Sequence, residues 1–261
     1  MNNTNQLLPR VIPVLLLKNR GELVKTLRFK NPVYIGDPLN AVKIFNEKEA
    51  DEILILDIEA SKQNRAPDFE YIEQIATECF MPVTYGGAIK SIEDVQRIIS
   101  CGIEKISLNT SVSIHLNLIT EAANLYGSSS VVAAIDVKKD LLGRRKIFLH
   151  SQNKISNTDP IAFIKQAETA GAGEILLQSV DRDGSMNGYD LEFLREVSSA
   201  VSIPVIACGG AGTLEHFAEA LRAGASAVAA GSKFVFYGKH RAVLINYPTQ
   251  EELFPFLSAQ L

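Results

Sequence analysis

The sequence is poor in cysteine and has no tryptophan and no long apolar run. Its three cysteines, Cys79, Cys101 and Cys208, are scattered and form no Cys-x-x-Cys pair. That pattern gives no disulfide framework and predicts free thiols in a cytoplasmic protein. No apolar stretch approaches the roughly 18 residues that a membrane helix needs, and the first residues show no basic-then-apolar export signal. Neither membrane insertion nor export is therefore expected.

The chain also lacks an excess of positive charge. Its net charge of −4 gives no indication of a nucleic-acid-binding surface. Its four histidines are dispersed, so no metal site is predicted, and no motif indicates a cofactor. What the chain does have is apolar material, because 46% of its 261 residues are hydrophobic, ample for a core. No linker-like segment divides it, so we expect one domain over residues 1–261.

The two halves of the chain share one pattern. An apolar run leads into Gly86-Gly87 and then a helical stretch, and a second run leads into Gly209-Gly210 in the same way, at an offset of 209 − 86 = 123 residues. Two more pairs of segments repeat at offsets of 122 and 120 residues, namely 52–56 with 174–178 and 14–18 with 134–138. Three offsets that agree so closely indicate two homologous halves.

Short apolar runs alternate with stretches of helical periodicity along the whole chain. The runs are 11–17, 53–58, 83–85, 106–108, 131–137, 175–179, 205–207 and 227–230, and the helical stretches are 38–48, 69–78, 92–100, 116–126, 160–170, 190–199 and 214–223. Near-continuous apolar runs of this length predict parallel strands that are buried on both faces. Eight such units predict a (β/α)8 TIM barrel built from two (β/α)4 halves. A doubly wound open sheet is the alternative.

Residues at the upper rim, where the predicted strands end, are the candidates for binding. A glycine turn before a helix presents backbone N–H groups that can surround an anionic oxygen. Two phosphate-binding cups are predicted on opposite sides of the barrel: Gly86, Gly87, Asn109 and Thr110 in the first, and Gly209, Gly210, Gly231 and Ser232 in the second. Ser179 and Gly184 stand at the same rim. The alternative is that the glycines only make the turns.

Two aspartates between the cups could exchange protons as general acid and base. Asp136 interrupts a buried apolar strand, which is costly for a carboxylate without a role. Asp183 lies in an Asp-Arg-Asp-Gly turn, where turn formation is an equal alternative. At the opposite mouth, four strand starts carry charges of alternating sign, namely Arg10, Glu52, Lys105 and Glu174. They could form a ring of salt bridges or a polar plug that only stabilises that end.

Together these motifs resemble the HisF-like family, the cyclase subunit of imidazole glycerol phosphate synthase, from residue 10 to about residue 236. The motifs are Leu-Asp-Ile-Glu-Ala-Ser at 56–61, Tyr-Gly-Gly-Ala-Ile at 85–89, Ala-Ile-Asp-Val-Lys at 134–138, Gly-Ala-Gly-Glu-Ile-Leu-Leu at 171–177, Asp-Arg-Asp-Gly-Ser at 181–185 and Cys-Gly-Gly-Ala-Gly at 208–212. The fourth and fifth motifs together are specific to that family among duplicated barrels.

The resemblance implies a partner and a route for ammonia. A glutaminase with a Cys-His-Glu triad would release ammonia at the bottom of the barrel, and the ammonia would cross the interior to the phosphate-lined top. The four charged residues at the strand starts fall on the positions that gate this mouth in the family. Asp136 occupies the position of one catalytic aspartate, and Lys25 that of a substrate-binding lysine. The family's reaction cleaves and cyclises a ribulosyl aminoimidazole bisphosphate.

The first half of the chain departs from the family. The other catalytic aspartate falls on Leu16, which is also the counterpart of Asp136 in the internal repeat. Leucine can neither take up nor release a proton, and losing a positioned acid or base costs a factor of about 10² to 10⁴ in rate. The third glycine of the first cup is Ala88, and the family's Asp-Gly-Arg after the first strand reads Asn-Arg-Gly-Glu at 19–22.

These departures resemble a diverged branch of the family that is associated with sugar amidation in surface-polysaccharide (lipopolysaccharide) synthesis. The segments Leu-Leu-Leu-Lys-Asn at 15–19 and Tyr-Ile-Gly-Asp-Pro at 34–38 are similar to that branch. There, the barrel and its glutaminase supply ammonia to a separate amidotransferase that converts a sugar N-acetyl group to an acetamidino group. Two alternatives stay open. One is an authentic histidine-pathway cyclase with a substitute acid such as Asp183, and the other is a noncatalytic activator of the glutaminase.

Overall fold

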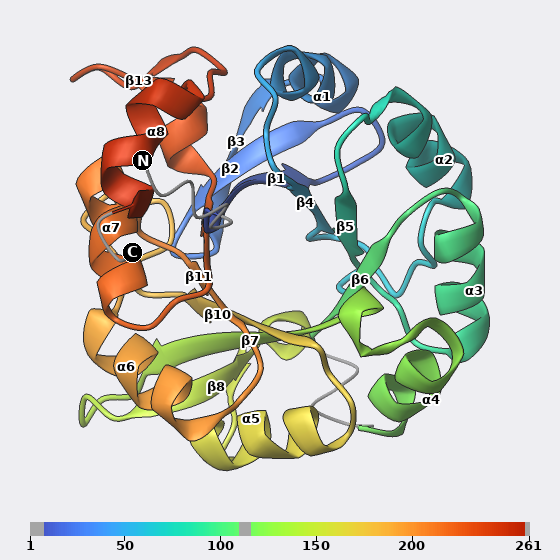
Figure 1. The fold of residues 1–261 in the computed structure, drawn as a ribbon. Coiled ribbons are helices and arrows are strands. Elements are labelled where there is room, and N and C mark those ends of the chain that lie inside the picture. Colours follow the sequence, from blue (N-terminus) through green and yellow to red (C-terminus); the bar gives the residue numbers. More distant parts are fainter. Residues whose placement is uncertain (1–7, 110–115, 259–261) are drawn as a thin grey trace, which may run out of the picture.

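The computed structural model describes residues 8–109 and 116–258. Eight parallel strands form its centre: β1 (Arg10–Leu17), β4 (Ile53–Asp57), β5 (Val83–Gly86), β6 (Lys105–Leu108), β7 (Val131–Lys139), β10 (Glu174–Ser179), β11 (Val205–Cys208) and β12 (Ala227–Ala230). Since β12 pairs with β1 and β7 pairs with β10, these strands close into a ring (Figure 1). The predicted (β/α)8 barrel is confirmed, and the open-sheet alternative is wrong.

Helices cover the outside of the ring, one after each barrel strand (Figure 1). They are α1 (Pro38–Glu47), α2 (Phe69–Glu78), α3 (Ile92–Ser100), α4 (Asn117–Tyr126), α5 (Pro160–Thr169), α6 (Leu191–Ala200), α7 (Leu214–Arg222) and α8 (Gln250–Leu257). Local chemistry fixes their starts: Asp37 and Asp159 cap α1 and α5 by accepting a backbone N–H, and a proline follows each cap. The sequence pattern predicts α1 to α7 to within one residue at each end, but not α8.

Antiparallel hairpins extend the barrel at its upper end. β2 (Leu23–Leu27) and β3 (Lys30–Gly36) follow β1, β8 (Arg145–Leu149) and β9 (Lys154–Ile155) follow β7, and β13 (Phe236–Tyr237) and β14 (Ala242–Val243) precede α8. β1 and β7 begin the two predicted halves, so the first two hairpins are inserted at the same place in each repeat. The sequence pattern predicts none of these hairpins, because their strands are short or, like β3, mostly exposed.

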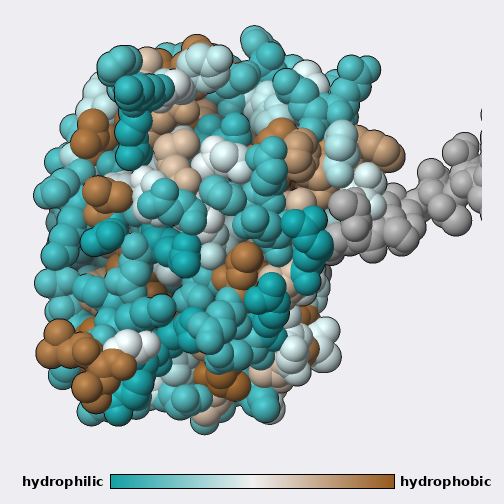
Figure 2. Space-filling model, turned by 90° about the vertical axis from the view of Figure 1, so that its left-hand side faces the viewer, coloured by the Kyte–Doolittle hydropathy of each residue, from teal (hydrophilic) through white to brown (hydrophobic). Residues whose placement is uncertain are grey.

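Side chains alternate along the barrel strands between two hydrophobic clusters. Outward-facing residues such as Val11 and Leu15 pack with the helices. Inward-facing residues such as Ile12, Leu54 and Leu176 fill the barrel interior. The face of the molecule in Figure 2 is mostly hydrophilic, with hydrophobic residues in small separate groups. Among the described residues, no helix has the length and hydropathy to cross a membrane.

The first hairpin is held against the loop that follows β10. Gly184 in that loop has a φ of +67°, and a Cβ there would lie 2.2 Å from the carbonyl oxygen of Thr26 in β2. The backbone N–H of Arg28 donates to the carbonyl oxygen of Asp183 at 3.0 Å. Only glycine satisfies both the left-handed backbone and this close approach. The loop and the hairpin therefore position each other over the upper end of the barrel.

We expect Gly184→Ala to lower the free energy of unfolding by about 2 to 4 kcal/mol, because it combines backbone strain with a collision against β2. Gly21→Ala is the matched control: Gly21 has a φ of +77°, but a Cβ there would have no heavy atom within 4 Å. That control should lose about 1 kcal/mol, the cost of the left-handed conformation alone. Urea unfolding measures both variants, and equal losses would contradict the close approach.

Candidate functional site

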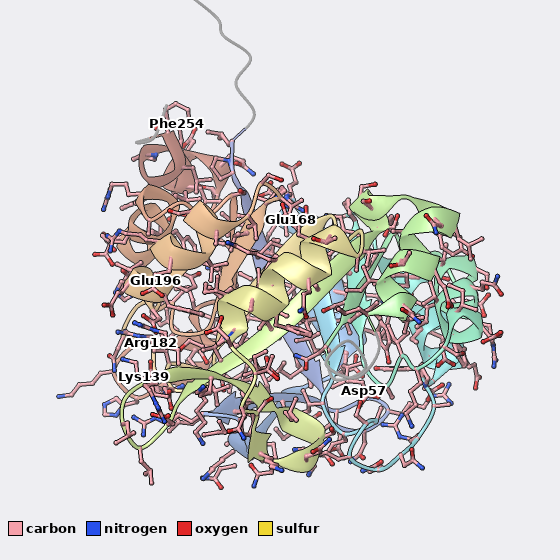
Figure 3. The ribbon with its side chains drawn as sticks, turned by 90° about the horizontal axis from the view of Figure 1, so that it is seen from below. Asp57, Lys139, Glu168, Arg182, Glu196 and Phe254 are labelled. Carbon is pink, nitrogen blue, oxygen red and sulfur yellow. The ribbon has the colours of Figure 1, made fainter. Side chains whose placement is uncertain are left out.

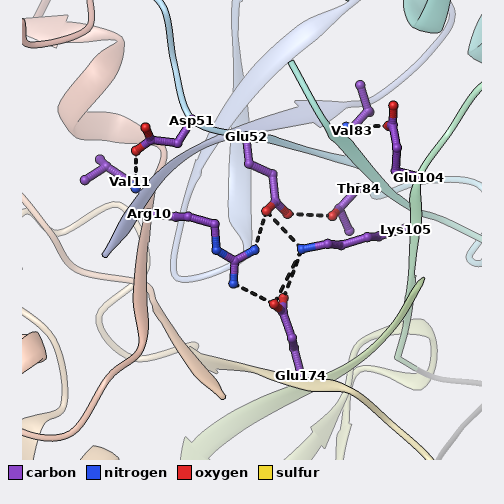
Figure 4. Close-up of polar contacts among 9 residues, drawn as sticks. All are labelled: Arg10, Val11, Asp51, Glu52, Val83, Thr84, Glu104, Lys105 and Glu174. Atoms are coloured by element: carbon purple, nitrogen blue, oxygen red, sulfur yellow. Dashed lines mark hydrogen bonds and ion pairs between the residues drawn. The ribbon is translucent and has the colours of Figure 1, made fainter. Parts of the chain in front are cut away.

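Four charged side chains meet at the N-terminal mouth of the barrel (Figure 4). Arg10 forms ion pairs with Glu52 and with Glu174, the latter at 2.6 Å. Lys105 pairs with the same two carboxylates at 3.1 and 3.4 Å. The hydroxyl of Thr84 donates to the second oxygen of Glu52 at 2.8 Å. The four residues that the sequence places at strand starts thus form one closed network of alternating charge, which we call the charged ring.

The charged ring is sensitive to the loss of any member because it is partly withdrawn from water. The side chain of Glu52 is only 3% exposed, and removing one cation from such a network costs about 3 to 5 kcal/mol. Above the ring the interior is apolar, with Ile12, Val14 and Leu54 among its inward-facing residues. The inward-facing side chains between the charged ring and the upper cavity are therefore mostly apolar.

The upper end of the barrel holds a cavity of about 500 Å³, within the size range of small-molecule sites. The predicted first cup contributes Gly86, Gly87 and Asn109 to its lining, and Asp136 stands in the same lining. Thr110, the fourth predicted member of that cup, lies outside the described residues. The structure therefore places the described residues of the first cup in the same cavity as Asp136, a candidate proton-transfer group.

The backbone of the first glycine turn is shaped by close packing. A Cβ at Gly86 would lie 2.9 Å from the side chain of Leu56, and a Cβ at Gly87 would lie 2.7 Å from that of Asp57. Both glycines are therefore needed for packing, whatever they bind. Ala88 follows in the left-handed region with a φ of +53°, a conformation that glycine adopts without strain. The turn keeps a glycine-like backbone although its third residue is alanine.

Asp136 is the buried carboxyl group of the cavity, 5% exposed on β7. Burial raises its pKa to about 7, a hydrogen bond from Asn109 opposes the rise, and the charge of Asp183 adds to it. A carboxyl group that titrates near neutral pH can both hold and release a proton. Asp136 therefore has the protonation behaviour of a general acid or base.

A smaller hollow of about 30 Å³ adjoins the cavity. The predicted second cup and its neighbours line it, namely Lys25, Asp183, Gly184, Gly209, Gly210, Gly231 and Ser232. Lys25 is 4% exposed, and its ammonium group donates to the carbonyl oxygen of Val14. Burial lowers the pKa of Lys25 to about 8, and the charge of Asp183 opposes this shift. The hollow therefore combines glycine turns with one buried cation.

Asp183 is fixed in that hollow by the first hairpin. Its carboxylate accepts hydrogen bonds from the hydroxyl of Thr26 at 2.8 Å and from the backbone N–H of Phe29 at 3.1 Å. Burial nevertheless raises its pKa, with these hydrogen bonds and the charge of Lys25 opposing. The structure thus gives Asp183 fixed partners on the hairpin, in addition to its place in a turn.

Leu16 stands where the two hollows meet, and it lines both together with Thr26 and Gln178. It lies in register with Leu56 of β4, as Asp136 lies in register with Gln178 of β10. These two pairs correspond in the internal repeat. The second half therefore carries a carboxyl group and an amide where the first half carries two leucines.

Ser179 lines neither hollow, because alternation along β10 turns Gln178 inward and Ser179 outward. Gln178 was not predicted as part of the site. The alternation of side chains along β10 could have identified it, because Glu174, Leu176 and Gln178 lie on the same inward face of the strand. Phe29 and His150 also line the cavity. They stand on or beside the hairpins, so their place cannot be predicted from the strand pattern.

Other charged residues at this end of the barrel are engaged by the protein itself. The carboxylate of Asp57 accepts two hydrogen bonds from Arg65, at 2.9 and 3.2 Å. Arg182 donates to two backbone carbonyl oxygens of its own loop, each at 3.1 Å. Asp57 and Arg182 come from opposite halves of the chain and stand well apart in Figure 3. Asp136 and Asp183 remain the candidates for proton exchange.

Asp136→Asn should make the stability of the protein less dependent on pH. Folding raises the pKa of Asp136 from 3.8 to about 7. Between these pH values the carboxyl group is ionised in the unfolded chain but still protonated in the folded one, so the unmodified protein loses stability as pH rises through this range. A shift of about three units corresponds to ~4 kcal/mol. We expect the variant to gain stability over the unmodified protein at pH 8 but not at pH 4. Guanidinium titrations that give the same difference at both pH values would contradict the burial of an ionisable group.

Comparisons with known proteins agree with this architecture. A family model described as "Histidine biosynthesis protein" matches residues 10–241. The chain is 50% identical over 245 residues to "Putative imidazole glycerol phosphate synthase subunit hisF2" of Pseudomonas aeruginosa, covering 94% of this chain and 97% of that protein. It is 43% identical over 235 residues to "Imidazole glycerol phosphate synthase subunit HisF" of Geobacillus kaustophilus, covering 90% and 92%. With its closed barrel, the chain belongs to the histidine biosynthesis protein family, as a homologue of the HisF cyclase subunit of imidazole glycerol phosphate synthase.

Proposed function

We propose that this chain receives ammonia from a partner glutaminase at the charged ring and carries it through the barrel to the upper end. The ammonia then serves a separate amidotransferase, which converts a sugar N-acetyl group to an acetamidino group for surface-polysaccharide (lipopolysaccharide) synthesis. One observation carries the proposal: the charged ring is complete, whereas the apolar Leu16 lines the upper cavity, where the resemblance to the family places an acid or base.

The lower half of the barrel supports the transport part of the proposal. Ammonia is uncharged, so crossing an apolar interior costs it far less than it would cost ammonium, the charged form that an apolar interior excludes. The charged ring lies at the mouth where the glutaminase of the family docks, and its members Arg10 and Lys105 each bridge both carboxylates. A shift of one cationic side chain would leave each carboxylate with one of its two cationic partners, so the network could open without separating all of its charges, which suits a gate.

The upper half supports a change in chemistry. Leu16 is 7% exposed and packs in the interior cluster, so a proton donor is absent from the position opposite Asp136. Loss of a positioned acid or base costs a factor of about 10² to 10⁴ in rate. An enzyme that depended on its own cyclisation reaction would be slowed by this loss of rate. A barrel that only delivers ammonia to another enzyme needs no acid or base at this position, so the replacement does not slow it.

The pattern of identity supports a branch apart from the plain HisF subunit. The chain is 50% identical to the protein named hisF2 and 48% identical to "Putative imidazole glycerol phosphate synthase subunit hisF3" of Vibrio vulnificus. Its identity to HisF of Geobacillus kaustophilus is 43%. The difference is consistent with divergence of this chain together with the numbered proteins.

An authentic histidine-pathway cyclase is the second candidate, and the state of Asp183 favours it. This carboxyl group has a raised pKa and faces Lys25 in the second hollow. Asp183 could therefore hold the proton that Leu16 cannot. In that case Asp136 and Asp183 would form the acid–base pair and the product would be imidazole glycerol phosphate. A noncatalytic activator of the glutaminase is the third candidate.

The proposal predicts that the purified chain does not turn over the ribulosyl aminoimidazole bisphosphate with ammonia, either unmodified or as Leu16→Asp. The unmodified chain should still raise the activity of its glutaminase partner. Ammonia-dependent formation of imidazole glycerol phosphate measures the first outcome, with Geobacillus kaustophilus HisF as the positive control. Ammonia release from glutamine measures the second.

Turnover by the unmodified chain, lost in Asp183→Asn, would establish the cyclase instead. Rescue of a histidine auxotroph that lacks its own cyclase would agree with that result. Glutaminase activation with no transfer of nitrogen to a sugar, even when the amidotransferase is added, would leave the chain as an activator only. Each of these results contradicts the proposed function.

A further inference from the structure

The exposed hydrophobic side chains of the described residues are concentrated at the upper end of the barrel. Eight of the eleven large ones lie on the antiparallel hairpins and their turns, whereas Phe80, Leu125 and Phe254 lie elsewhere. The eight are Leu27, Val33, Tyr34, Leu141, Leu142, Tyr237, Val243 and Leu244. Single exposed hydrophobic residues are ordinary on a protein surface, but their concentration at one end indicates a surface that another molecule covers.

Two of these side chains stand together in the turn between β7 and β8, residues 140–144, which we call the leucine tip. Leu141 and Leu142 are 106% and 74% exposed. Exposed turns usually carry small or polar residues, because an apolar side chain there gains nothing from the fold. The leucine tip thus holds two large apolar side chains in water, where they add nothing to the core.

The backbone of the leucine tip is fixed by hydrogen bonds. The carboxylate of Asp140 accepts from the backbone N–H groups of Leu142 and Arg144, both at 2.9 Å, and from Nε of Arg144 at 2.8 Å. At the base of the tip, Arg145 donates to both carboxylate oxygens of Asp190 at 2.9 and 3.0 Å, which fastens β8 to the start of α6. A loop that already holds one conformation loses less entropy on binding. The two leucines are therefore presented in a defined position.

The leucine tip stands beside the outlet of the barrel. β7 carries Asp136 in the lining of the upper cavity and ends at Lys139, three residues or roughly 10 Å further along the strand. Lys139 lies toward the same end of the molecule as Asp57 and Arg182, away from Phe254 (Figure 3). A protein bound to the tip therefore lies next to the mouth of the cavity. A glutaminase docked at the charged ring, on the opposite end, does not reach this surface.

The charge around the leucine tip indicates the chemistry of its partner. Residues 138–146 contain five basic side chains and one acidic one, a local net charge of +4 in a chain whose net charge is −4. Lys139 and Arg144 are exposed on the two sides of the tip. A second copy of this chain docked tip to tip would bring like charges together. A partner with an apolar pocket and an acidic rim fits the tip instead.

We propose that the leucine tip is the docking site for the enzyme that receives the ammonia, and that Leu141 and Leu142 enter an apolar pocket rimmed with carboxylates on that enzyme. This inference rests on the proposed function and deepens it, because it names the surface through which the barrel and the sugar amidotransferase meet. Tyr34 and Tyr237, on two other hairpins of the upper end, extend the contact. Docking there covers the outlet, so that ammonia passes from one protein to the other.

The test measures binding between the full chain and a purified sugar amidotransferase, selected because it forms the acetamidino sugar from free ammonium. Leu141→Gln and Leu142→Gln keep the length of the side chain and remove its apolar character, at a place where the fold loses no packing. We expect each variant to weaken the complex at least about tenfold in biolayer interferometry. Leu125→Gln is the matched control, because Leu125 is 55% exposed on α4 and stands on none of the hairpins. This control should bind as tightly as the unmodified chain.

The same variants separate docking from chemistry when the glutaminase is added. They should form less acetamidino sugar from glutamine but as much from free ammonium, because only nitrogen from glutamine passes through the docked outlet. Activation of the glutaminase should stay unchanged, because the leucine tip lies at the other end of the barrel.

Equal binding by Leu141→Gln, Leu142→Gln and Leu125→Gln would overturn the inference, as would the lack of any complex with the unmodified chain. The proposed function would still stand if the unmodified chain delivered nitrogen from glutamine to the sugar. Failure of that delivery, with the complex intact and weakened by the tip variants, would contradict the proposed function alone. A dimer of this chain that Leu141→Gln dissociates in sedimentation velocity would assign the tip to a second copy and overturn the inference.

Discussion

Closure of the eight-stranded parallel ring between β1 and β12 is the constraint on which the rest of the site depends. In a closed ring, alternate residues of every strand point toward one axis. Arg10 and Glu174 therefore meet at the lower mouth although 164 residues separate them. At the upper end the same geometry brings Leu16 and Asp136 into one cavity lining. An open sheet of the same strands would leave these groups apart.

Withdrawal from water then gives these side chains their properties. It makes the charged ring depend on complete pairing, since Glu52 has almost no access to solvent. It lowers the pKa of Lys25 to about 8 and raises that of Asp136 to about 7, so that both groups change charge near neutral pH. Leu16, buried in the interior cluster, offers no group at its place in the cavity lining that could carry a proton.

The two halves of the barrel show how one backbone can hold different chemistry. The second half keeps Asp136 beside Gln178, and the first half holds Leu16 beside Leu56 in the equivalent register. Both halves carry a hairpin after their first strand, and the hairpins meet over the cavity through Phe29 and His150. Divergence has therefore changed inward-facing side chains and left the duplicated framework in place.

Sequence periodicity was sufficient to predict the barrel and most of its elements, because strands buried on both faces give unbroken apolar runs. The four residues of the charged ring could be predicted as neighbours, since Arg10, Lys105 and Glu174 each open a strand and Glu52 directly precedes one. Position in the chain predicts Ser179 at the rim, where it ends β10, but it cannot tell that the inward-facing Gln178 rather than Ser179 lines both hollows. The place of His150 depends on how two hairpins pack on each other, and no periodic signal encodes that contact.

Passage of ammonia through the barrel is the central claim, and isotope partition tests it most directly. The chain, a partner glutaminase and the proposed amidotransferase would be supplied with glutamine labelled with ¹⁵N at the amide, together with an excess of unlabelled ammonium. The account predicts that the new nitrogen of the acetamidino sugar is predominantly ¹⁵N, because channelled ammonia does not mix with the solvent pool. A product whose label matches the diluted pool in solution would contradict the account.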